Sequence, residues 1–413
     1  MKAFEYIDGE LSCEGVSVAS IARDVGTPFY LYSAAAIESN YLAFEQALRG
    51  VPHLTCFAVK ANSNLAVVKL LKDLGSGFDI VSQGELYRLQ KIGADPQRIL
   101  FSGVGKTDEE IEAALHAGIL ELNAESEHEL DRIEKLAAAR SIRAAVALRV
   151  NPDVDPKTHP YIATGLQLHK FGVSMDDAAR LYSRPEKYPH LIFSGISCHI
   201  GSQITELTPF RDAISNLCRL IHDLGKQGGT LKYLDIGGGL GIRYDCEQPP
   251  SIDEYVTAVL GEIRDLAITL LLEPGRRVVG NAGVLVSRVL LTKKSSLKKF
   301  VVVDAGMNDL IRPALYGAFH RIDPVHQSTD ELETVDVVGP VCETGDYLAK
   351  DRPMPPVKAG DLVAVRDVGA YGYSQVSNYN SRRRVAEVMV QNGTFRVVRA
   401  RESFEDMVRL ERF

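Results

Sequence analysis

The sequence lacks any long apolar run, because no stretch approaches the about 18 uncharged apolar residues that a membrane-spanning helix needs. Paired cysteines are also missing. The six cysteines are scattered without a C-x-x-C spacing, so neither a disulfide framework nor a zinc site is indicated. Residues 1–5 include an early acid and show no apolar core of a signal peptide. We therefore expect a protein of the reducing cytoplasm, with no membrane partner and no metal site.

An excess of positive charge is missing as well. The 413 residues include 54 acidic and 47 basic side chains, a formal net charge of −7, so there is no basic footprint for nucleic acid. The hydrophobic content of 45% and the charged content of 24% are those of an ordinary soluble globular protein. The length suggests two or three domains, although an α/β barrel by itself often exceeds about 200 residues.

The sequence does contain a regular alternation of short apolar runs and helix-like stretches, after a β-rich segment at 1–33 and an amphipathic helix at 35–48. The candidate strands are 55–60, 77–81, 98–102, 119–123, 144–150, 192–199, 233–236 and 270–273. The helix-like stretches are 65–74, 85–92, 108–117, 125–139, 175–182, 209–227 and 252–266. This alternation predicts right-handed βαβ units and a parallel sheet. Eight strands in about 220 residues favour a closed (β/α)8 barrel, and an open, doubly wound sheet is the alternative.

The helical signal fades after about residue 278. The β-like stretches that follow are 284–292, 300–303, 334–338, 362–366, 385–390 and 394–399. They indicate a C-terminal antiparallel β domain, which the N-terminal strands join because they too are β-like and precede the barrel. The predicted domains are therefore 1–33, which packs with the β domain, 34–277, the barrel, and 278–413, the β domain.

A lysine is the last residue of the first candidate barrel strand. Residues 54–59 are apolar enough for a buried strand, and Lys60 stands at its carboxyl end. In a pocket, the low dielectric disfavours the charged amine and lowers its pKa, which yields a nucleophile of the kind that forms Schiff bases. The alternative is a lysine that extends from the strand end into water.

Polar side chains follow the other strands too. In (β/α)8 barrels the chemistry takes place at the carboxyl ends of the strands. Strand ends also meet water, which accounts for some polar residues, but not for a lysine, a histidine, a glycine triplet and a glutamate together. The residues at these ends are Lys60, 79–82, Ser102, Asn123, Asn151, His199, Gly237 and Glu273.

Two glycine-rich stretches differ in what they indicate. Residues 236–241 follow the seventh predicted strand, where consecutive glycines let backbone N–H groups approach a phosphate, although a tight turn is the alternative. Residues 103–107 imitate a nucleotide-binding P-loop, but Leu100 stands where its first glycine is required. Thr107 and Glu110 instead predict a capping box at the start of a helix.

Two strand ends suggest a flat cofactor. His199 would stack on a ring or donate a proton, although a single histidine is commonly structural. A buried Glu273 needs a partner. A carboxylate facing a protonated pyridine nitrogen is the pairing expected in enzymes that use pyridoxal 5′-phosphate (PLP), and an ion pair between Glu273 and Arg276 is the alternative.

The β domain adds candidate binding residues. Arg312 would bind a carboxylate in a bidentate manner, Glu343 an ammonium group and Tyr371 a phosphate. Each of these residues alone is more commonly part of an ordinary surface. Only their combination with the strand-end residues is specific.

Together these residues resemble the fold-type III PLP-dependent decarboxylases, whose barrel and β-domain architecture is shared with alanine racemase. The resemblance covers essentially the whole chain. Within the family, the chain resembles the members that decarboxylate meso-2,6-diaminopimelate to L-lysine and carbon dioxide, the last step of lysine biosynthesis in bacteria. The passages that carry it are 57–62, 78–86, 149–152, 158–165, 170–172, 199–203, 237–241, 273–276, 312–316, 342–346, 369–373 and 378–380.

The resemblance implies a role for each matching residue. Lys60 would be the Schiff-base lysine, His199 would stack on the cofactor ring, and Cys342 would be the proton donor. The positions implied to bind or surround the cofactor are Lys60, Asp79, His199, Ser202, Gly237, Gly238, Gly239, Glu273, Gly275, Arg276 and Tyr371, with Glu273 at the pyridinium nitrogen. The positions implied for the substrate are Arg276, Arg312, Tyr316, Glu343 and Tyr371.

The resemblance also implies a homodimer with shared active sites, because Cys342 and Glu343 would come from the neighbouring subunit.

Alternative functions on the same fold are decarboxylation of ornithine, of arginine or of a carrier-tethered amino acid. Ornithine and arginine lack the distal carboxylate that Arg312 suits. A racemase would be expected to have an arginine in place of Glu273, and a non-catalytic homologue would be expected to lack Lys60 or Cys342. Residues 165–170 are more apolar than the family pattern.

Overall fold

The computed structural model describes residues 3–155, 170–226 and 228–413. Two compact units are formed by different parts of the chain. The barrel unit consists of Tyr41–Ile242 and Gln248–Arg277, and the β unit of Met1–Asn40, Arg243–Glu247 and Val278–Phe413. The predicted domain boundaries at 33/34 and 277/278 stay a prediction.

In the barrel unit, eight of the described strands are parallel and close into a barrel in chain order. The last strand pairs with the first, with Leu271 opposite Leu54. The strands are β5 (His53–Ala58), β6 (Gly77–Ile80), β7 (Ile99–Phe101), β8 (Glu121–Ala124), β9 (Ala144–Arg149), β10 (Leu191–Ser197), β11 (Tyr233–Asp235) and β12 (Thr269–Leu272). Because the sheet closes, it is not the open, doubly wound alternative, and the predicted barrel is confirmed.

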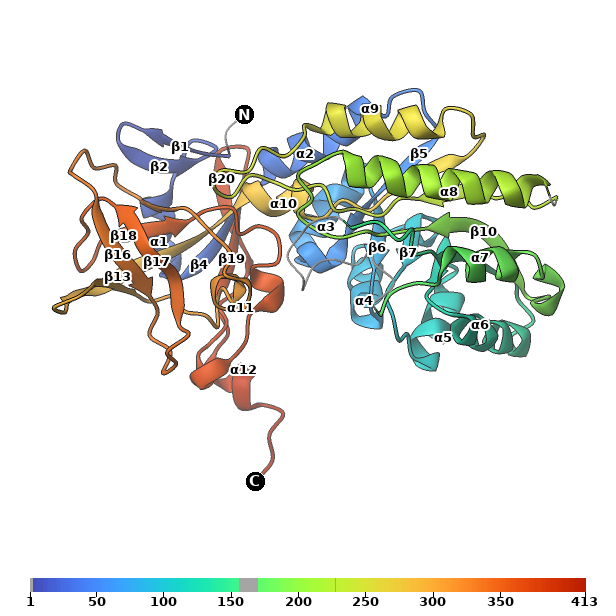
Figure 1. Cartoon of the computed structure of the whole chain (residues 1–413). Coiled ribbons are helices and arrows are strands. Elements are labelled where there is room, and N and C mark those ends of the chain that lie inside the picture. Colours follow the sequence, from blue (N-terminus) through green and yellow to red (C-terminus); the bar gives the residue numbers. More distant parts are fainter. Residues whose placement is uncertain (1–2, 156–169, 227) are drawn as a thin grey trace. The chain divides into compact units, whose positions relative to one another are not determined.

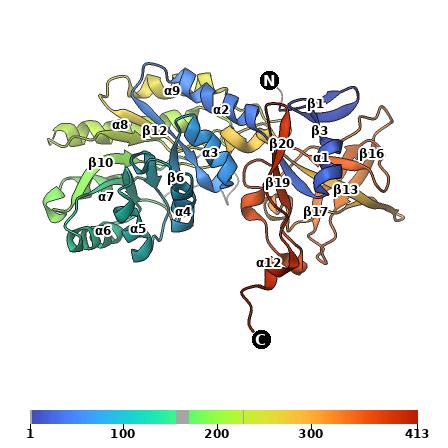
Figure 2. The same ribbon diagram turned by 180° about the vertical axis from the view of Figure 1, so that it is seen from behind.

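Helices connect these strands on the outside of the barrel (Figures 1 and 2). They are α3 (Leu65–Asp73), α4 (Gln83–Lys91), α5 (Asp108–Ala117), α6 (Glu127–Ala139), α7 (Met175–Tyr182), α8 (Thr208–Lys226) and α9 (Ile252–Ile263), with α2 (Ala34–Ala47) before them and α10 (Arg276–Val279) after. Hydroxyl side chains accept backbone N–H groups at several helix starts, where no carbonyl is available within the helix. The predicted capping box of Thr107 and Glu110 is one of these and is confirmed.

In the β unit, nine of the described strands form one sheet, which β4 (Phe29–Ser33) joins from the N-terminal segment. The others are β13 (Gly283–Lys294), β14 (Lys299–Val303), β15 (Ile322–Pro324), β16 (Glu333–Val338), β17 (Tyr347–Met354), β18 (Leu362–Val365), β19 (Ala386–Gln391) and β20 (Thr394–Arg399). Most pairs are antiparallel, but β14 with β16 and β4 with β19 are parallel, so the sheet is more mixed than the sequence predicted.

Smaller elements complete the β unit. β1 (Phe4–Ile7), β2 (Glu10–Cys13) and β3 (Val16–Ser17) form a separate sheet, and the helices are α1 (Val18–Val25), α11 (Arg312–Tyr316) and α12 (Phe404–Val408). α1 lies in a segment predicted to be β-rich, and its buried Val18, Ile21 and Ala22 show the spacing of a helix. β17 was not predicted, because charged residues in its middle conceal the alternation of a strand.

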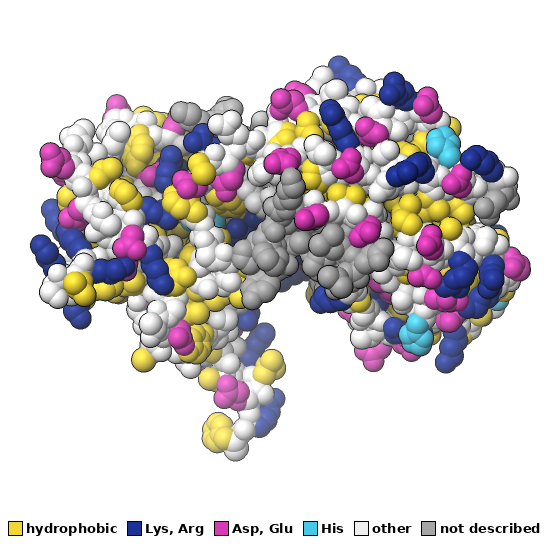
Figure 3. Space-filling model, viewed as in Figure 1, with side chains coloured by type: hydrophobic (Ala, Val, Ile, Leu, Met, Phe, Trp, Pro, Cys, Tyr) yellow, Lys and Arg dark blue, Asp and Glu magenta, His cyan; other side chains and the backbone are white. Residues whose placement is uncertain are grey.

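Acidic and basic side chains are interspersed on the face shown in Figure 3, and the formal net charge of the chain is −7. Of the helices in the described residues, none combines the length and the apolar character that crossing a membrane requires.

The barrel core contains Leu100 of β7, which is fully buried against Cys56 and Leu271. We predict that Leu100→Ala lowers the free energy of unfolding by about 2–5 kcal/mol, because the lost apolar contacts leave a cavity. The matched control is Leu297→Ala, since Leu297 is 91% exposed and its truncation should change stability by less than about 0.5 kcal/mol. Denaturant unfolding measures both, and equal effects would contradict this account of the core.

Candidate active site

Lys60 lies just after β5, not within it as predicted. The strand ends at Ala58, and a single 3-10 turn, η1 (Val59–Ala61), carries the lysine between two buried neighbours. Its Nζ donates to Oδ2 of Asp79, on β6, at 2.5 Å. A third of the Lys60 side chain is exposed, whereas that of Asp79 is fully buried. The amine is therefore paired with a buried acid and does not simply extend into water.

A cavity of about 350 Å³ opens at this lysine. Its lining comes from the carboxyl ends of the barrel strands and the loops that follow them. The lining residues are Lys60, Val81, Ser102, Gly103, Val104, Asn123, Arg149, Phe171, Ser197, Cys198, His199, Asp235 and Glu273. The sequence predicted that polar strand ends converge at one mouth. The structure shows this for Lys60, Ser102, Asn123, His199 and Glu273.

A network of hydrogen bonds connects the acids of this mouth. Ser102 Oγ donates to Glu273 Oε1 at 3.2 Å. The amide of Asn123 donates to Ser102 Oγ at 3.0 Å and to Asp235 Oδ2 at 3.1 Å. Four side chains from different strands are thus fixed relative to one another. In the structure Glu273 accepts a hydrogen bond from Ser102, whereas the alternative from the sequence was an ion pair with Arg276.

These acids share a low-dielectric site in which Lys60 is paired with Asp79 and Arg149 with Glu125. Burial, and then the charges of Asp235 and Asp79, raise the pKa of Glu273 well above its ordinary value. Burial also raises the pKa of Asp235 to about 6. In addition, Oδ1 of Asp79 is buried without a hydrogen-bond partner in the described residues. Such a site favours a further cation, and a protonated pyridine nitrogen fits that requirement.

The predicted glycine loop follows β11 and leaves no room for side chains. Gly237 and Gly239 have positive φ angles of 65° and 113°. A Cβ atom at Gly237, Gly238 or Gly239 would lie 2.5, 2.3 or 2.6 Å from the carbonyl oxygens of Cys198, Glu273 and Gly201, respectively. Since real Cβ atoms do not approach so closely, only glycine fits at these three positions. The N–H of Gly237 donates to Asp235 Oδ1 at 2.9 Å, which anchors the loop to the acid network.

Arg276 and Ser202 provide further anion-binding groups. Gly275 directly precedes α10, and Arg276 is the first residue of that helix. The guanidinium of Arg276 is buried, and its Nη2 donates to Ser202 Oγ at 3.0 Å. A guanidinium, a hydroxyl and a glycine loop are the groups that hold a phosphate in proteins, so the residues present fit the phosphate of PLP.

His199 is held as a neutral ring. The N–H of Gly238 donates to His199 Nδ1 at 3.2 Å, so that nitrogen is an acceptor and the ring proton lies on Nε2. Burial, together with the charges of Arg149 and Lys60, lowers the pKa of His199 well below its ordinary value. The structure therefore places an uncharged imidazole on the wall of the cavity, connected to the glycine loop.

Two charged residues that line this cavity were not among the site residues predicted from the sequence. Arg149 is buried at the end of β9, 2.9 Å from Glu125 Oε1, and its guanidinium carbon lies 4.6 Å from the centre of the Phe171 ring. Asp235 ends β11 and binds both the glycine loop and Asn123. In both cases the signal was a charged residue ending an apolar strand. The passage 158–165 and the apolar residues 165–169 lie outside the described residues.

The other predicted residues belong to the β unit. Arg312 begins α11, is buried, and donates from Nε to His320 Nε2 at 3.2 Å. Tyr316 ends the same helix, and its hydroxyl accepts from Gln375 at 3.5 Å. Tyr371 is half-buried with a φ of 56°.

Cys342 and Glu343 lie together on an exposed loop of the β unit. The N–H of Cys342 donates to the side chain of Asn380 at 2.7 Å, and Glu343 accepts from the hydroxyl of Tyr379 at 3.1 Å. The two neighbouring residues predicted to act on the substrate are therefore accessible in the single chain, and the segment 378–380 supports their loop.

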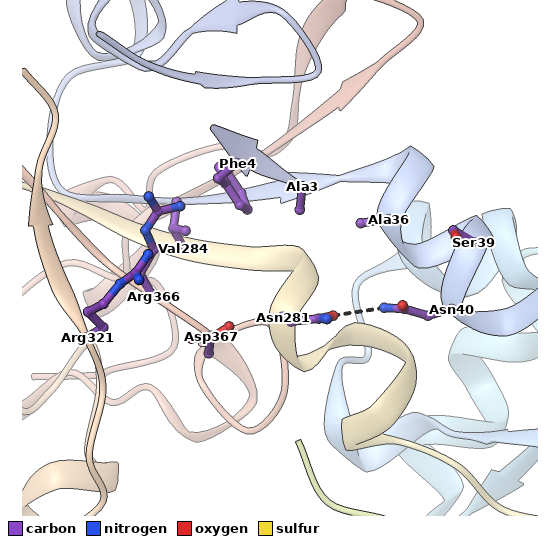
Figure 4. Close-up of a pocket in the computed structure, with 10 residues that line it drawn as sticks. All are labelled: Ala3, Phe4, Ala36, Ser39, Asn40, Asn281, Val284, Arg321, Arg366 and Asp367. Carbon is purple, nitrogen blue, oxygen red and sulfur yellow. Dashed lines mark hydrogen bonds between the residues drawn. The ribbon is translucent and has the colours of Figure 1, made fainter. Parts of the chain in front are cut away.

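The β unit contains a different pocket, of about 330 Å³ (Figure 4). On one side Asn40 donates to Asn281 at 2.8 Å. On the other, Arg366 and Arg321 are both paired with Asp323, at 2.8 and 3.0 Å. None of the predicted site residues is among the described residues that line this pocket, so we do not assign the active site to it.

Comparison with known proteins shows the family of this chain. Residues 34–280 match the model of the pyridoxal-dependent decarboxylase family, pyridoxal binding domain. Diaminopimelate decarboxylase from Pseudomonas aeruginosa is 50% identical over 98% of both chains, and that from Vibrio cholerae is 50% identical over 100% of this chain and 99% of its own. The solved diaminopimelate decarboxylase from Helicobacter pylori, complexed with L-lysine, has a TM-score of 0.92 and 42% identity over 95% of this chain and 98% of its own.

The chain therefore belongs to the pyridoxal-dependent decarboxylases, fold-type III enzymes with a barrel that binds PLP. Within this class it is a member of the diaminopimelate decarboxylase family. The predictions of a carboxy-lyase and of PLP as its cofactor are confirmed.

The glycine loop allows a direct test of the cofactor site. We predict that Gly238→Ala abolishes PLP binding or weakens it by at least about tenfold, because the new Cβ displaces the backbone that carries Glu273. Gly261→Ala in α9 is the matched control, since a Cβ there meets nothing within 4 Å and should leave binding unchanged. Titration of cofactor-free protein with PLP, followed by its absorption, measures both. Normal PLP affinity in the Gly238 variant would contradict the assignment.

The raised pKa of Glu273 predicts a dependence of stability on pH. The folded protein binds the proton of the Glu273 carboxyl group more tightly than the unfolded chain does. The protonated carboxyl group therefore contributes its full stabilisation at pH values below its pKa in the unfolded chain, and this contribution is lost as the pH rises through its pKa in the folded protein. Cofactor-free Glu273→Gln should therefore gain stability relative to the wild type between about pH 5 and about pH 8, by up to about 1.4 kcal/mol for each unit between the two pKa values. Denaturant unfolding at both pH values measures the gain.

The exposed Glu186 offers a matched control for this experiment. Glu186→Gln removes a carboxyl group of the same kind from the surface, and its stability relative to the wild type should change little over the same pH range. The same pH-dependent gain in both variants would contradict a specific effect of burial at Glu273.

Proposed function

We propose that this protein converts meso-2,6-diaminopimelate to L-lysine and carbon dioxide. The observation that carries the proposal is the identity of half of the residues, along the whole chain, with diaminopimelate decarboxylases of two bacteria. The solved relative from H. pylori was crystallised with L-lysine, the product of the proposed reaction. This substrate is an amino acid with an amine and a carboxylate at each end.

The barrel residues are proposed to hold PLP. Lys60 would bind it covalently through Nζ, and Glu273 would face its ring nitrogen. The glycines 237–239, Ser202 and Arg276 would hold the phosphate, with Gly275 and Tyr371 beside it, and His199 would contact the ring. Asp79, fully buried at 2.5 Å from Lys60 Nζ, would balance the positive charge of that amine before PLP binds.

When bound, PLP supplies an electron sink for the carbon that loses carbon dioxide. The contribution of the chain is electrostatic and positional. A carboxylate at Glu273, hydrogen-bonded by Ser102 and packed beside Asp235, would keep a proton on the ring nitrogen and so keep the sink effective. Burial of this network excludes water, which strengthens the interaction.

Recognition of the distal end of the substrate is proposed for Arg276, Arg312, Tyr316, Glu343 and Tyr371. An arginine binds a carboxylate in a planar, bidentate manner, and a glutamate suits an ammonium group. Ornithine and arginine lack the distal carboxylate, so they would lose the bidentate hydrogen bonds that an arginine makes to it. That loss is the physical basis for selecting diaminopimelate.

Cys342 is proposed to return a proton to the carbon that has lost carbon dioxide. We further propose that the protein is a cytoplasmic homodimer in which Cys342 and Glu343 complete the active site of the neighbouring subunit. The exposure of both residues in the single chain supports this arrangement, because a residue that acts on a partner's substrate must be accessible before the subunits associate.

A panel of substrates tests the proposal. Purified protein with PLP should release carbon dioxide chiefly from meso-diaminopimelate and much less from the LL and DD isomers, ornithine or arginine. Lys60→Ala should reduce the rate by at least about a thousandfold, since both covalent attachment and the amine are lost. Borohydride should attach PLP irreversibly to Lys60 in the wild type. Faster turnover of ornithine, arginine or a carrier-tethered amino acid would overturn the choice of substrate, and failure to bind PLP would overturn the mechanism.

A further inference from the structure

Two buried side chains surround Arg312 in the β unit. Arg312 is 7% exposed, and its neighbour His320 is fully buried. Arginine is a long side chain with about 2 kcal/mol of rotamer entropy, so a defined orientation in the folded protein requires contacts that hold it. The chain supplies such contacts from a histidine on one side and an aromatic ring on another.

The hydrogen bonds of His320 fix its tautomer. Its Nδ1 lies 2.8 Å from the carbonyl oxygen of Arg366, which can only accept, so Nδ1 carries the ring proton and donates it. Its Nε2 is therefore the acceptor for the Nε–H of Arg312, at 3.2 Å. The imidazole thus connects Arg312 to the backbone that directly follows β18.

That backbone is itself part of the sheet. The N–H of Arg366 donates to the carbonyl of Arg321 at 2.8 Å, which extends the pairing of β15 with β18. The carbonyl of His320 accepts from Arg352 of β17 at 2.6 Å. His320 is consequently held by the backbone after β18 and by a side chain of β17, and these contacts restrict the arginine that it contacts.

Tyr244 provides the second contact. It belongs to the short segment Arg243–Glu247 that the β unit takes up from the middle of the barrel sequence. The guanidinium carbon of Arg312 lies 5.2 Å from the centre of the Tyr244 ring, within the range of a cation–π interaction. The same ring lies 5.2 Å from His320 at an angle of 82°, so the three side chains form one cluster.

We propose that His320 and Tyr244 are positioning residues for the substrate, which act only through Arg312. His320 takes up the Nε–H, so a bidentate carboxylate would bind along the edge formed by the two Nη groups of Arg312. Neither positioning residue needs to touch the substrate. This inference rests on the proposed function, in which Arg312 binds the distal carboxylate.

A pair of ligands isolates that interaction. L-lysine keeps the distal carboxylate of the substrate, whereas cadaverine has the same carbon chain and both amines but no carboxylate. A residue that acts through Arg312 should therefore affect the affinity for L-lysine and leave that for cadaverine unchanged. A residue needed only for folding would affect both ligands alike. Binding of each to the PLP-loaded protein, followed by its absorption, gives the two affinities.

Two substitutions of His320 separate its two hydrogen bonds. His320→Asn keeps a donor near the place of Nδ1 but no acceptor for Arg312, whereas His320→Gln places an amide oxygen near the position of Nε2. We expect His320→Asn to weaken L-lysine binding about tenfold, the effect of one lost hydrogen bond to a charged group, and His320→Gln to recover most of that loss. For turnover of meso-diaminopimelate, KM should rise and kcat should stay within about twofold, since the contact is the same in ground and transition states.

A double-mutant cycle with Arg312→Ala tests whether His320 acts through the arginine. In that background His320→Asn should cause no further loss of L-lysine affinity. Tyr244→Leu removes the aromatic ring that Arg312 contacts, whereas Tyr244→Phe keeps it. This pair of variants tests the other contact of Arg312 in the same way, and it decides the question if His320→Asn does not fold. Losses that add to the effect of Arg312→Ala, equal losses for cadaverine, or unchanged L-lysine affinity in both His320→Asn and Tyr244→Leu would overturn the proposal.

The wild type distinguishes this inference from the function on which it rests. If the PLP-loaded wild type neither decarboxylates meso-diaminopimelate nor binds L-lysine, both fail. If it does both, and Arg312→Ala weakens L-lysine binding while the His320 and Tyr244 variants do not, only the positioning role fails.

Discussion

Backbone hydrogen bonds beyond the strand ends hold the catalytic mouth together. The N–H of Ala58 donates to the carbonyl of Pro274 at 3.1 Å, and that of Glu273 donates to Gly237 at 2.8 Å. The first of these bonds exists only because the barrel closes and makes its first and last strands neighbours, whereas the second joins the consecutive strands β11 and β12. Closure therefore brings together the lysine turn, the glycine loop and the segment around Glu273, which are widely separated in sequence. The chemistry of the site depends on this arrangement of the backbone.

Electrostatic imbalance is the second feature of the site. Asp79, Asp235 and Glu273 are buried at the mouth that also contains Lys60 and Arg149, and burial is the largest cause of the raised pKa of both Asp235 and Glu273. A buried carboxylate without a cation costs stability, so the site is destabilising without its cofactor. A cationic ring nitrogen would relieve that cost, which means that affinity for the cofactor and its activation as an electron sink have the same physical origin.

The β unit provides recognition by another principle. Its sheet gives a rigid frame for short segments that carry single functional side chains, such as α11 with Arg312. The segment Arg243–Glu247 leaves the barrel sequence and contributes Tyr244 to this frame. Specificity for a carboxylate would thus depend on residues remote in sequence from the arginine that binds it, because a long flexible side chain selects a ligand well only when its orientation is fixed.

Much of the architecture could be predicted from the chain, since strand and helix patterns are local. The alternation over 55–273 predicted the barrel, the consecutive glycines predicted a loop without side chains, and the spacing of Thr107 and Glu110 predicted a helix start. The mixed sheet of the β unit could not be predicted in this way. Charges interrupt the pattern of β17, and the parallel pairing of β4 with β19 joins the two ends of the chain.

The same division holds for the candidate site. The chemical groups of the site can be read from the chain: the amine of Lys60, the acid Glu273, the guanidiniums and the glycines. What each group faces depends on how the chain folds. Folding turned Lys60 toward Asp79, connected Glu273 through Ser102 and Asn123 to Asp235, and set His320 against Arg312. The physical reason is that hydrogen bonding and desolvation depend on distances between residues far apart in the chain, and folding alone sets those distances.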